Sequence, residues 1–220
     1  MKTLFLSYFR SFALAFVALI WGVELVERLL GNGSFVWMGT HPRHLNEWYT
    51  MLTGALVHGD WMHLINNTYP LLILGFFIIL LFERYSWLVF LSTYLASGLL
   101  IFLFARGNVY HIGASGVVYC WAAFLAASGL LRKDRLSLAL GLVVAFLYGG
   151  MIWGVLPIQE GVSWDGHLFG ALAGILLAYA FRKLNKKKRE VEFEDLDDGY
   201  DFDNYKYGEF EYLREKRGEG

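Results

Sequence analysis

Long apolar stretches alternate with short polar segments along most of the chain. An α-helix needs roughly 17 to 25 predominantly apolar residues to cross a hydrocarbon core about 30 Å thick. Six stretches approach or reach this length: Phe12–Leu30, Met62–Phe82, Trp87–Ala105, Gly113–Leu131, Leu136–Ile158 and Gly166–Phe181. The pattern therefore predicts an all-α, polytopic membrane protein with six transmembrane helices.

Composition agrees with this prediction. Of the 220 residues, 56% are hydrophobic, 18% are aromatic and only 18% are charged, with a mean hydropathy of +0.42. A soluble domain of this size has no interior large enough to hide that much apolar surface. The single cysteine, Cys120, lies in an apolar stretch and is interpreted as a small buried hydrophobe. The first apolar stretch exceeds the usual length of a signal-peptide core, so we expect it to remain as an anchor.

The segments outside the apolar stretches differ in kind. Residues 31–60 carry Trp37, Trp48 and Tyr49, which favours a loop lying in the lipid headgroup region. Residues 190–220 contain 12 acidic and four basic residues. Such a charged block is interpreted as a solvated, flexible tail, with a partner-binding segment as the alternative. We therefore expect a membrane core at 1–184 and a cytoplasmic tail at 185–220.

The distribution of Lys and Arg predicts the orientation, because these residues flank the cytoplasmic ends of membrane helices. With a cytoplasmic N-terminus, twelve basic residues, including Lys133 and Lys183, fall on the cytoplasmic side. Only Arg28, Arg43 and Arg106 fall on the opposite side. Both termini are thus expected in the cytoplasm, and the cell membrane is the expected location.

This topology places four polar side chains, Ser115, His167, His63 and Asn67, at the outer ends of three predicted helices. Burying such groups in lipid is costly, so their presence indicates a function. His63 and Asn67 are four residues apart and share a helix face, as do Ser115 and Tyr119. Hydropathy and charge together bring the four groups to one membrane depth.

Small residues predict which helices approach each other. Gly170 and Gly174 are one turn apart, and His167 lies one turn before Gly170. Small residues with this spacing let helix backbones approach closely in lipid. The fourth predicted helix is itself rich in Gly and Ala, so the two are expected to pack together. This packing would bring His167 within hydrogen-bond reach of Ser115.

Each of these residues also has a purely structural interpretation. A serine in a membrane helix often bonds back to a carbonyl one turn earlier, and an asparagine such as Asn67 can hold two helices together. Asp165 stands beside His167, but residues two apart on a helix face away from each other. We therefore interpret Asp165 as a capping or interface residue.

Metal binding and proton transport are alternative functions for the buried histidines. His58 and His63 are five residues apart and do not form a helical metal pair, although a loop-and-helix zinc site with His167 remains an alternative. A proton-relay transporter would need acidic residues or broken helices near the midplane, and the sequence has neither there. The sequence contains no Walker motif and no His-Glu-x-x-His motif. No cofactor, metal or nucleic-acid partner is expected.

Three motifs in order resemble those of the rhomboid intramembrane serine proteases. They are His63-x-x-x-Asn67, Gly113-Ala114-Ser115-Gly116-Val117-Val118-Tyr119 and Gly166-His167-x-x-Gly170-x-x-x-Gly174. His58 and the Glu83-Arg84 pair also match the pattern. The resemblance covers roughly residues 10–183, and the family's Trp-Arg signature in the first loop is not visible.

The resemblance implies an endopeptidase that cleaves transmembrane segments of proteins near the outer face of the bilayer, with a Ser-His dyad and no acidic third member. It implies Ser115 as nucleophile and His167 as general base, with Tyr119 packed against the imidazole. Asn67 and the backbone N–H of Ser115 would stabilise the oxyanion, with His63 and His58 as auxiliary groups.

The resemblance further implies that the fifth helix and the loop after it act as a lateral gate and lid. The bulky residues there would be Phe146, Tyr148, Met151 and Trp153, and the flexible ones Gly149, Gly150 and Gly154. A noncatalytic relative that binds transmembrane clients is the alternative function.

Overall fold

The computed structural model describes residues 12–133 and 163–184, together with 135–136, 138–139, 142–143 and 154–158. The longer helices within them are α2 (Phe12–Leu30), α4 (Trp61–Phe82), α5 (Ser86–Phe104), α6 (Ser115–Arg132) and α9 (Trp164–Ala180). These ranges contain no strand, only an isolated β-bridge between Thr40 and His111. The expected all-α class is confirmed for this part of the chain.

Two helical stretches of the described part are long and apolar enough to cross a membrane. One is Trp61–Phe104, which joins α4 to α5 through a short 3-10 turn, and the other is α6. Most of the fifth predicted helix, Leu136–Ile158, lies outside the described residues. The expectation of six crossings therefore stays a prediction.

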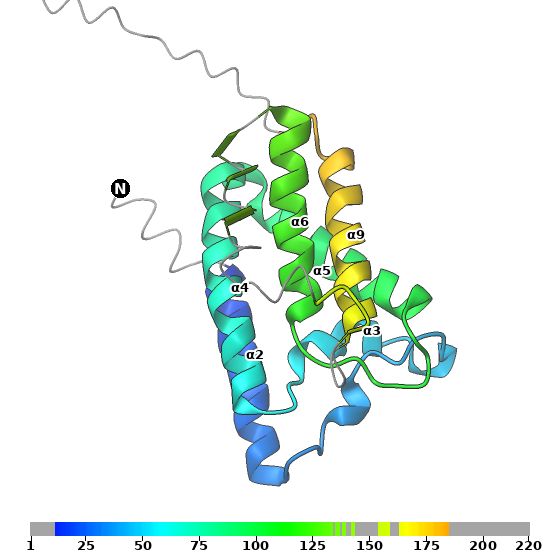
Figure 1. The fold of residues 1–220 in the computed structure, drawn as a ribbon. Helices are drawn as coiled ribbons and strands as arrows, with labels where there is room; N and C mark the ends of the chain where they lie inside the picture. Colours follow the sequence, from blue (N-terminus) through cyan, green and yellow to red (C-terminus); the bar gives the residue numbers. More distant parts are fainter. Residues whose placement is uncertain are drawn as a thin grey trace, which may run out of the picture. The chain divides into compact units, whose positions relative to one another are not determined.

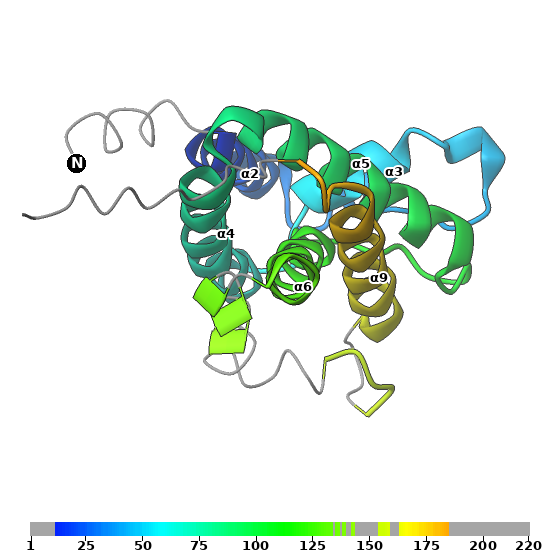
Figure 2. The ribbon, with the colours of Figure 1, turned by 90° about the horizontal axis from the view of Figure 1, so that it is seen from above.

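Helix α6 is the centre of the bundle. Figure 2 shows it surrounded by α4, α5 and α9, with α2 next to α4. In Figure 1, α4, α6 and α9 run side by side. The side chains of Trp121, Phe124 and Leu125 on α6 are fully buried. Cys120, also on α6, is a buried free thiol.

Helices α6 and α9 approach at backbone distance because glycines line their contact. A Cβ atom added to Gly170 would lie 2.3 Å from the carbonyl oxygen of Gly116. One added to Gly174 would lie 2.1 Å from the carbonyl oxygen of Cys120. Neither contact leaves room for a side chain, so the two glycines fix how closely α9 lies along α6.

An aromatic cluster joins α2, α5 and α6. The ring of Phe12 stacks on that of Phe90 with centroids 4.7 Å apart, and its edge meets Trp121 at 5.8 Å. The indole N–H of Trp121 donates to Thr93 Oγ1 over 2.8 Å. A buried indole therefore keeps a hydrogen-bond partner, as its polar edge requires in an apolar interior.

The first loop contains short helical turns: η1 (Val36–Met38), η2 (Leu45–Glu47), α3 (Thr50–Thr53) and η3 (Gly54–Leu56). It is fastened to α5, where a Cβ added to Gly98 would lie 2.0 Å from the carbonyl oxygen of Met51. The hydroxyl of Tyr94, one turn earlier on α5, donates to the carbonyl of Leu52.

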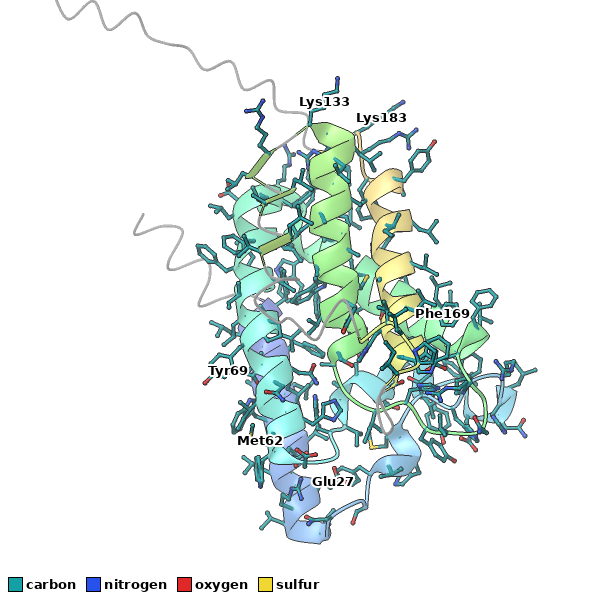
Figure 3. All side chains as sticks on the ribbon, in the orientation of Figure 1. Glu27, Met62, Tyr69, Lys133, Phe169 and Lys183 are labelled. Carbon is teal, nitrogen blue, oxygen red and sulfur yellow. The ribbon has the colours of Figure 1, made fainter. Side chains whose placement is uncertain are left out.

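The two ends of the bundle carry different side chains. Lys133 and Lys183 lie together at one end, whereas Met62 and Glu27 lie at the other (Figure 3). The basic end follows α6 and α9, and the opposite end carries the starts of α4, α6 and α9. The four polar residues singled out in the sequence belong to this second end.

Candidate active site

Ser115 is the first residue of α6, directly after a sharp turn. Gly113 has a φ of 103°, a backbone conformation that other residues rarely adopt. Its N–H donates to the carbonyl of Gly54 over 3.0 Å, and the N–H of Ala114 donates to Nε2 of His58 over 3.3 Å. The first loop therefore holds the backbone immediately before Ser115. The first N–H groups of a helix lack intrahelical partners, so they are available to an anion at Ser115.

His167 lies in the first turn of α9 and contacts Ser115 directly. Its Nε2 is 2.8 Å from Oγ of Ser115, and its Nδ1 is 2.9 Å from the carbonyl oxygen of Gly154. A carbonyl only accepts hydrogen bonds, so Nδ1 carries the proton and Nε2 presents its lone pair. The Ser115 hydroxyl therefore donates to His167, which is the direction that a general base requires.

Tyr119 lies one turn after Ser115 on α6. Its ring stacks on the imidazole of His167 with centroids 4.2 Å apart and an interplanar angle of 7°. Parallel stacking at this distance restricts rotation of the imidazole. The ring is thus fixed by hydrogen bonds at both nitrogens and by one aromatic face.

Asn67 and His63 approach the same turn from α4. A Cβ added to Gly113 would lie 2.4 Å from Nε2 of His63 and 3.5 Å from Nδ2 of Asn67. Asn67 is 5% exposed, and its Nδ2 has no hydrogen-bond partner among the described residues. A buried N–H donor without a partner is costly, and here it adjoins Gly113, two residues before Ser115 in the chain.

His58 acts on the site through the backbone. It is 2% exposed, and burial, together with the nearby His63, lowers the pKa of His58 to about 3. At neutral pH the imidazole is therefore uncharged, and its Nε2 accepts from the N–H of Ala114. Its ring meets that of His63 edge-on at 5.1 Å. His58 thus positions the turn before Ser115.

A polar cluster fastens the start of α9 to the loop between α5 and α6. The carboxylate of Asp165, which is 2% exposed, accepts from the backbone N–H and the guanidinium of Arg106 over 2.6 to 3.1 Å. Nε2 of His111 donates to the carbonyl of Arg106, and its Nδ1 accepts from the hydroxyl of Ser163. Burial lowers the pKa of His111, which keeps this ring neutral. The cluster fixes the helix turn that carries His167.

A narrow pocket of about 20 Å³ lies beside Ser115. A cavity of roughly 10 to 15 Å³ already accommodates one water molecule. Its polar lining includes Thr40, Ser97, His111 and Ser163. Oγ of Ser97 is buried and has no partner among the described residues, so a water there would find a hydrogen-bonding group.

The structure thus brings Ser115, His167 and Tyr119 into contact, with Asn67 and His63 at the adjoining turn. The expected gate residues Phe146, Tyr148, Gly149, Gly150, Met151 and Trp153 lie outside the described residues. Gly154 is described, and its carbonyl accepts from His167, a contact that the sequence analysis missed. It also missed the Arg106, His111 and Ser163 contacts, although it interpreted Asp165 as a capping or interface residue.

Across 12–133, 163–184 and the short stretches between them, no group of three or more His, Cys, Asp or Glu side chains is placed to hold a metal ion.

Comparison with known proteins gives consistent matches. A family model described as the Rhomboid domain matches residues 45–184. An uncharacterized protein of Mycobacterium tuberculosis (strain ATCC 25618 / H37Rv) is 37% identical over 188 residues, covering 81% of this chain and 78% of that protein. A Mycobacterium leprae protein is 34% identical, covering 81% and 74%. Rhomboid-like protein 11, chloroplastic, of Arabidopsis thaliana is 29% identical over 150 residues, covering 62% and 53%.

Proposed function

Because the chain belongs to the rhomboid family, we propose that it is an intramembrane serine endopeptidase whose nucleophile is Ser115. The family assignment confirms the resemblance carried by the three sequence motifs, and it makes the chain an integral membrane protein. The observation that supports catalysis is the pair of hydrogen bonds at His167, from Ser115 Oγ and to the Gly154 carbonyl.

In the first step, the Ser115 hydroxyl gives its proton to Nε2 of His167 as Oγ attacks the scissile carbonyl carbon. The imidazolium that forms carries a proton on each nitrogen. The Gly154 carbonyl continues to accept from Nδ1, so it stabilises the new positive charge as the carboxylate of a triad does. No acidic residue is needed in this step.

The carbonyl oxygen becomes an oxyanion as the tetrahedral intermediate forms. The supporting donors are Nδ2 of Asn67 and the backbone N–H of Ser115 at the start of α6. A hydrogen bond to a charged oxygen is stronger than one to a neutral carbonyl, so these donors stabilise the transition state more than the ground state. His63 adjoins the same turn as an auxiliary group.

The intermediate then collapses. His167 returns its proton to the leaving amine, the peptide C–N bond breaks, and the acyl group remains on Ser115 Oγ. A water molecule then gives a proton to His167 as its oxygen attacks this ester. The bond between the acyl carbon and Ser115 Oγ breaks, His167 returns the proton to Oγ, and the new carboxylic acid is released. The small polar pocket beside Ser115 supports a local supply of water inside an apolar bundle.

The proposed substrates are transmembrane segments with helix-breaking or small residues near their outer ends. In an intact helix each carbonyl is bonded to the N–H four residues later, so a segment must unwind before Ser115 can attack. Proline or glycine lowers that cost by roughly 1 to 3 kcal/mol. The proposed orientation, with both termini in the cytoplasm of the cell and Ser115 near the outer face, favours cleavage on the extracytoplasmic side.

Covalent labelling by a fluorophosphonate in detergent tests the proposal most directly. Modification confined to Ser115, and absent from Ser115→Ala, is the expected result. Ser34→Ala, at an exposed serine, is the matched control and should label like the wild type. Absence of labelling in folded wild-type protein would instead favour a noncatalytic member that binds transmembrane clients.

A reporter helix of leucine and alanine tests the substrate class. Versions that carry Gly-Ala-Pro in the outer, central or inner third are compared, and the outer version should be cleaved fastest. Equal cleavage of all versions would contradict the unwinding requirement. A preference for the inner version would contradict the proposed orientation.

A further inference from the structure

A second pocket lies apart from Ser115, between the first loop and the loop that joins α5 to α6. Its volume is about 470 Å³. It is lined by Pro42, Arg43, His44, Arg106, Gly107 and Asn108. This lining holds two guanidinium groups and an imidazole, and one guanidinium, that of Arg106, pairs with the carboxylate of Asp165 behind it. The guanidinium of Arg43 keeps the pocket net positive, which suits an anion.

Arg43 is held in place by bonds to the end of α5. Its backbone N–H donates to the carbonyl of Phe102 over 2.9 Å, and its Nη1 donates to the carbonyl of Ala105 over 2.5 Å. It adopts a φ of 65°, which few residues other than glycine do. A Cβ added to Gly107 would lie 2.7 Å from Nη2 of Arg43, so the guanidinium lies directly against the backbone of Gly107.

Arg106 is fixed from the other side. Its Nε and Nη2 donate to the buried carboxylate of Asp165, both over 3.1 Å. The Arg106 side chain nevertheless stays 46% exposed. Both arginines are therefore preorganised by contacts with the protein, which lowers the entropy cost of binding an anion between them.

An apolar stripe runs along α5 toward this pocket. Leu91, Leu95, Leu99 and Leu103 recur every four residues on one face, and each is 43 to 51% exposed. The stripe ends three residues before Arg106. On the first loop next to the pocket, Leu45 is 76% exposed and Trp48 is 55% exposed. Exposed apolar side chains on a membrane helix and its interfacial loop indicate contact with lipid.

From this juxtaposition we propose that the pocket binds the phosphate of a phospholipid headgroup while an acyl chain lies along the leucine stripe of α5. The charge and preorganisation of Arg43 and Arg106 account for the phosphate. The exposed leucine stripe would contact an acyl chain, which a phospholipid has and a soluble phosphate lacks. This site is separate from the proposed catalytic dyad, and its occupancy does not depend on proteolysis.

Native mass spectrometry of the full chain, released from detergent, measures binding directly. Dioleoyl phosphatidylglycerol is compared with dioleoylglycerol, which has the same chains without phosphate, and with glycerol phosphate, which has no chains. The phospholipid should bind most tightly. Equal binding of dioleoylglycerol would overturn the phosphate assignment, and equal binding of glycerol phosphate would overturn the lipid assignment.

A charge placed in the pocket localises the site. Asn108 is exposed and lines the pocket, so Asn108→Glu adds a negative charge without removing an arginine. It should weaken phosphatidylglycerol binding by about ten-fold, because like charges repel strongly at short range. Asn108→Gln is the control for size.

Asn32→Glu is the control for net charge, because this exposed residue lies on the first loop but does not line the pocket. Both controls should bind like the wild type. If Asn108→Glu also binds like the wild type, or if Asn32→Glu loses as much affinity, the phosphate does not occupy this pocket.

Discussion

The two halves of the candidate site differ in how completely their polar groups are paired. On the side formed by α6 and α9, both nitrogens of His167 have partners, and the ring stacks on Tyr119. On the side formed by α4, Asn67 buries an amide N–H that has no partner among the described residues. In the first half, every polar atom named has its partner without a substrate. The second half has a donor left for one more acceptor, and in the proposed mechanism the oxyanion of the tetrahedral intermediate is that acceptor.

Removing either member of the paired half should have the largest effect. Ser115→Ala and His167→Ala should each lower the rate of reporter cleavage by about 10⁴-fold or more, since the two groups act as a unit. The double variant should be no slower than either single one. Cleavage by purified protein in detergent measures this, with thermal unfolding as the control for folding. Additive losses would show that Ser115 and His167 act separately.

The unpaired half should respond more weakly. Asn67→Ala removes one oxyanion donor, which typically costs about 100- to 1000-fold in maximal rate, while the backbone donor at Ser115 remains. The neighbouring exposed Asn66→Ala is the matched control and should be near wild type. Rates at saturating substrate decide the matter. An unchanged maximal rate with a raised KM would make Asn67 a binding residue and remove the proposed contrast.

The close packing of α9 on α6, which forms the paired half, can be tested by a substitution that changes no polar group. Gly170→Ala would place a Cβ 2.3 Å from a backbone oxygen of α6, which no rotamer change can relieve. We expect a loss of about 1 to 3 kcal/mol of stability, with a parallel loss of cleavage as His167 moves away from Ser115. Gly22→Ala on α2, where nothing lies within 4 Å, is the control. Similar melting temperatures for both variants would contradict the close α6–α9 contact.

Low pH should destabilise the protein through His58, which positions the turn before Ser115. The pKa of His58 is about 3 in the folded state against an ordinary value of 6.5, so the unfolded chain binds the proton more readily. The stability contribution is therefore fully present above about pH 6.5 and is lost as the pH falls toward 3. In His58→Gln this titration is absent, and the amide oxygen can still accept from Ala114.

Melting temperatures measured from neutral pH down to about pH 4 should fall more steeply for the wild type than for His58→Gln. This is the smallest of the expected effects, because other buried histidines such as His111 also contribute to the slope. Parallel curves for the two proteins would mean that His58 is not the group that titrates.

Helix positions could be predicted closely from the sequence, because apolar length and polar boundaries determine them. The second predicted helix, Met62–Phe82, differs from α4 by one residue, and the third, Trp87–Ala105, differs from α5 by one at each end. The meeting of Ser115 with His167 could also be anticipated, since glycines at helical spacing allow close approach.

The contacts made by irregular segments could not be predicted in this way. The Gly154 carbonyl lies 13 residues before His167, and Arg106 lies 59 residues before Asp165. Neither partner has a periodic or compositional signature, because loop conformations depend on contacts between distant parts of the chain. The sequence indicated His58 as an auxiliary group but not its contact with Ala114, because its partner is a backbone N–H, which every residue except proline carries.

The close contact between Gly98 on α5 and the first loop limits how the loop can move. The carbonyl of Met51 occupies the space where a side chain on α5 would be, and the hydroxyl of Tyr94 donates to the carbonyl of the next residue, Leu52. The first loop cannot move outward on this side unless it breaks its contact with Gly98 or moves α5 with it. The first loop and α5 therefore move together, and under the proposed function a polypeptide substrate would reach Ser115 from another side of the bundle.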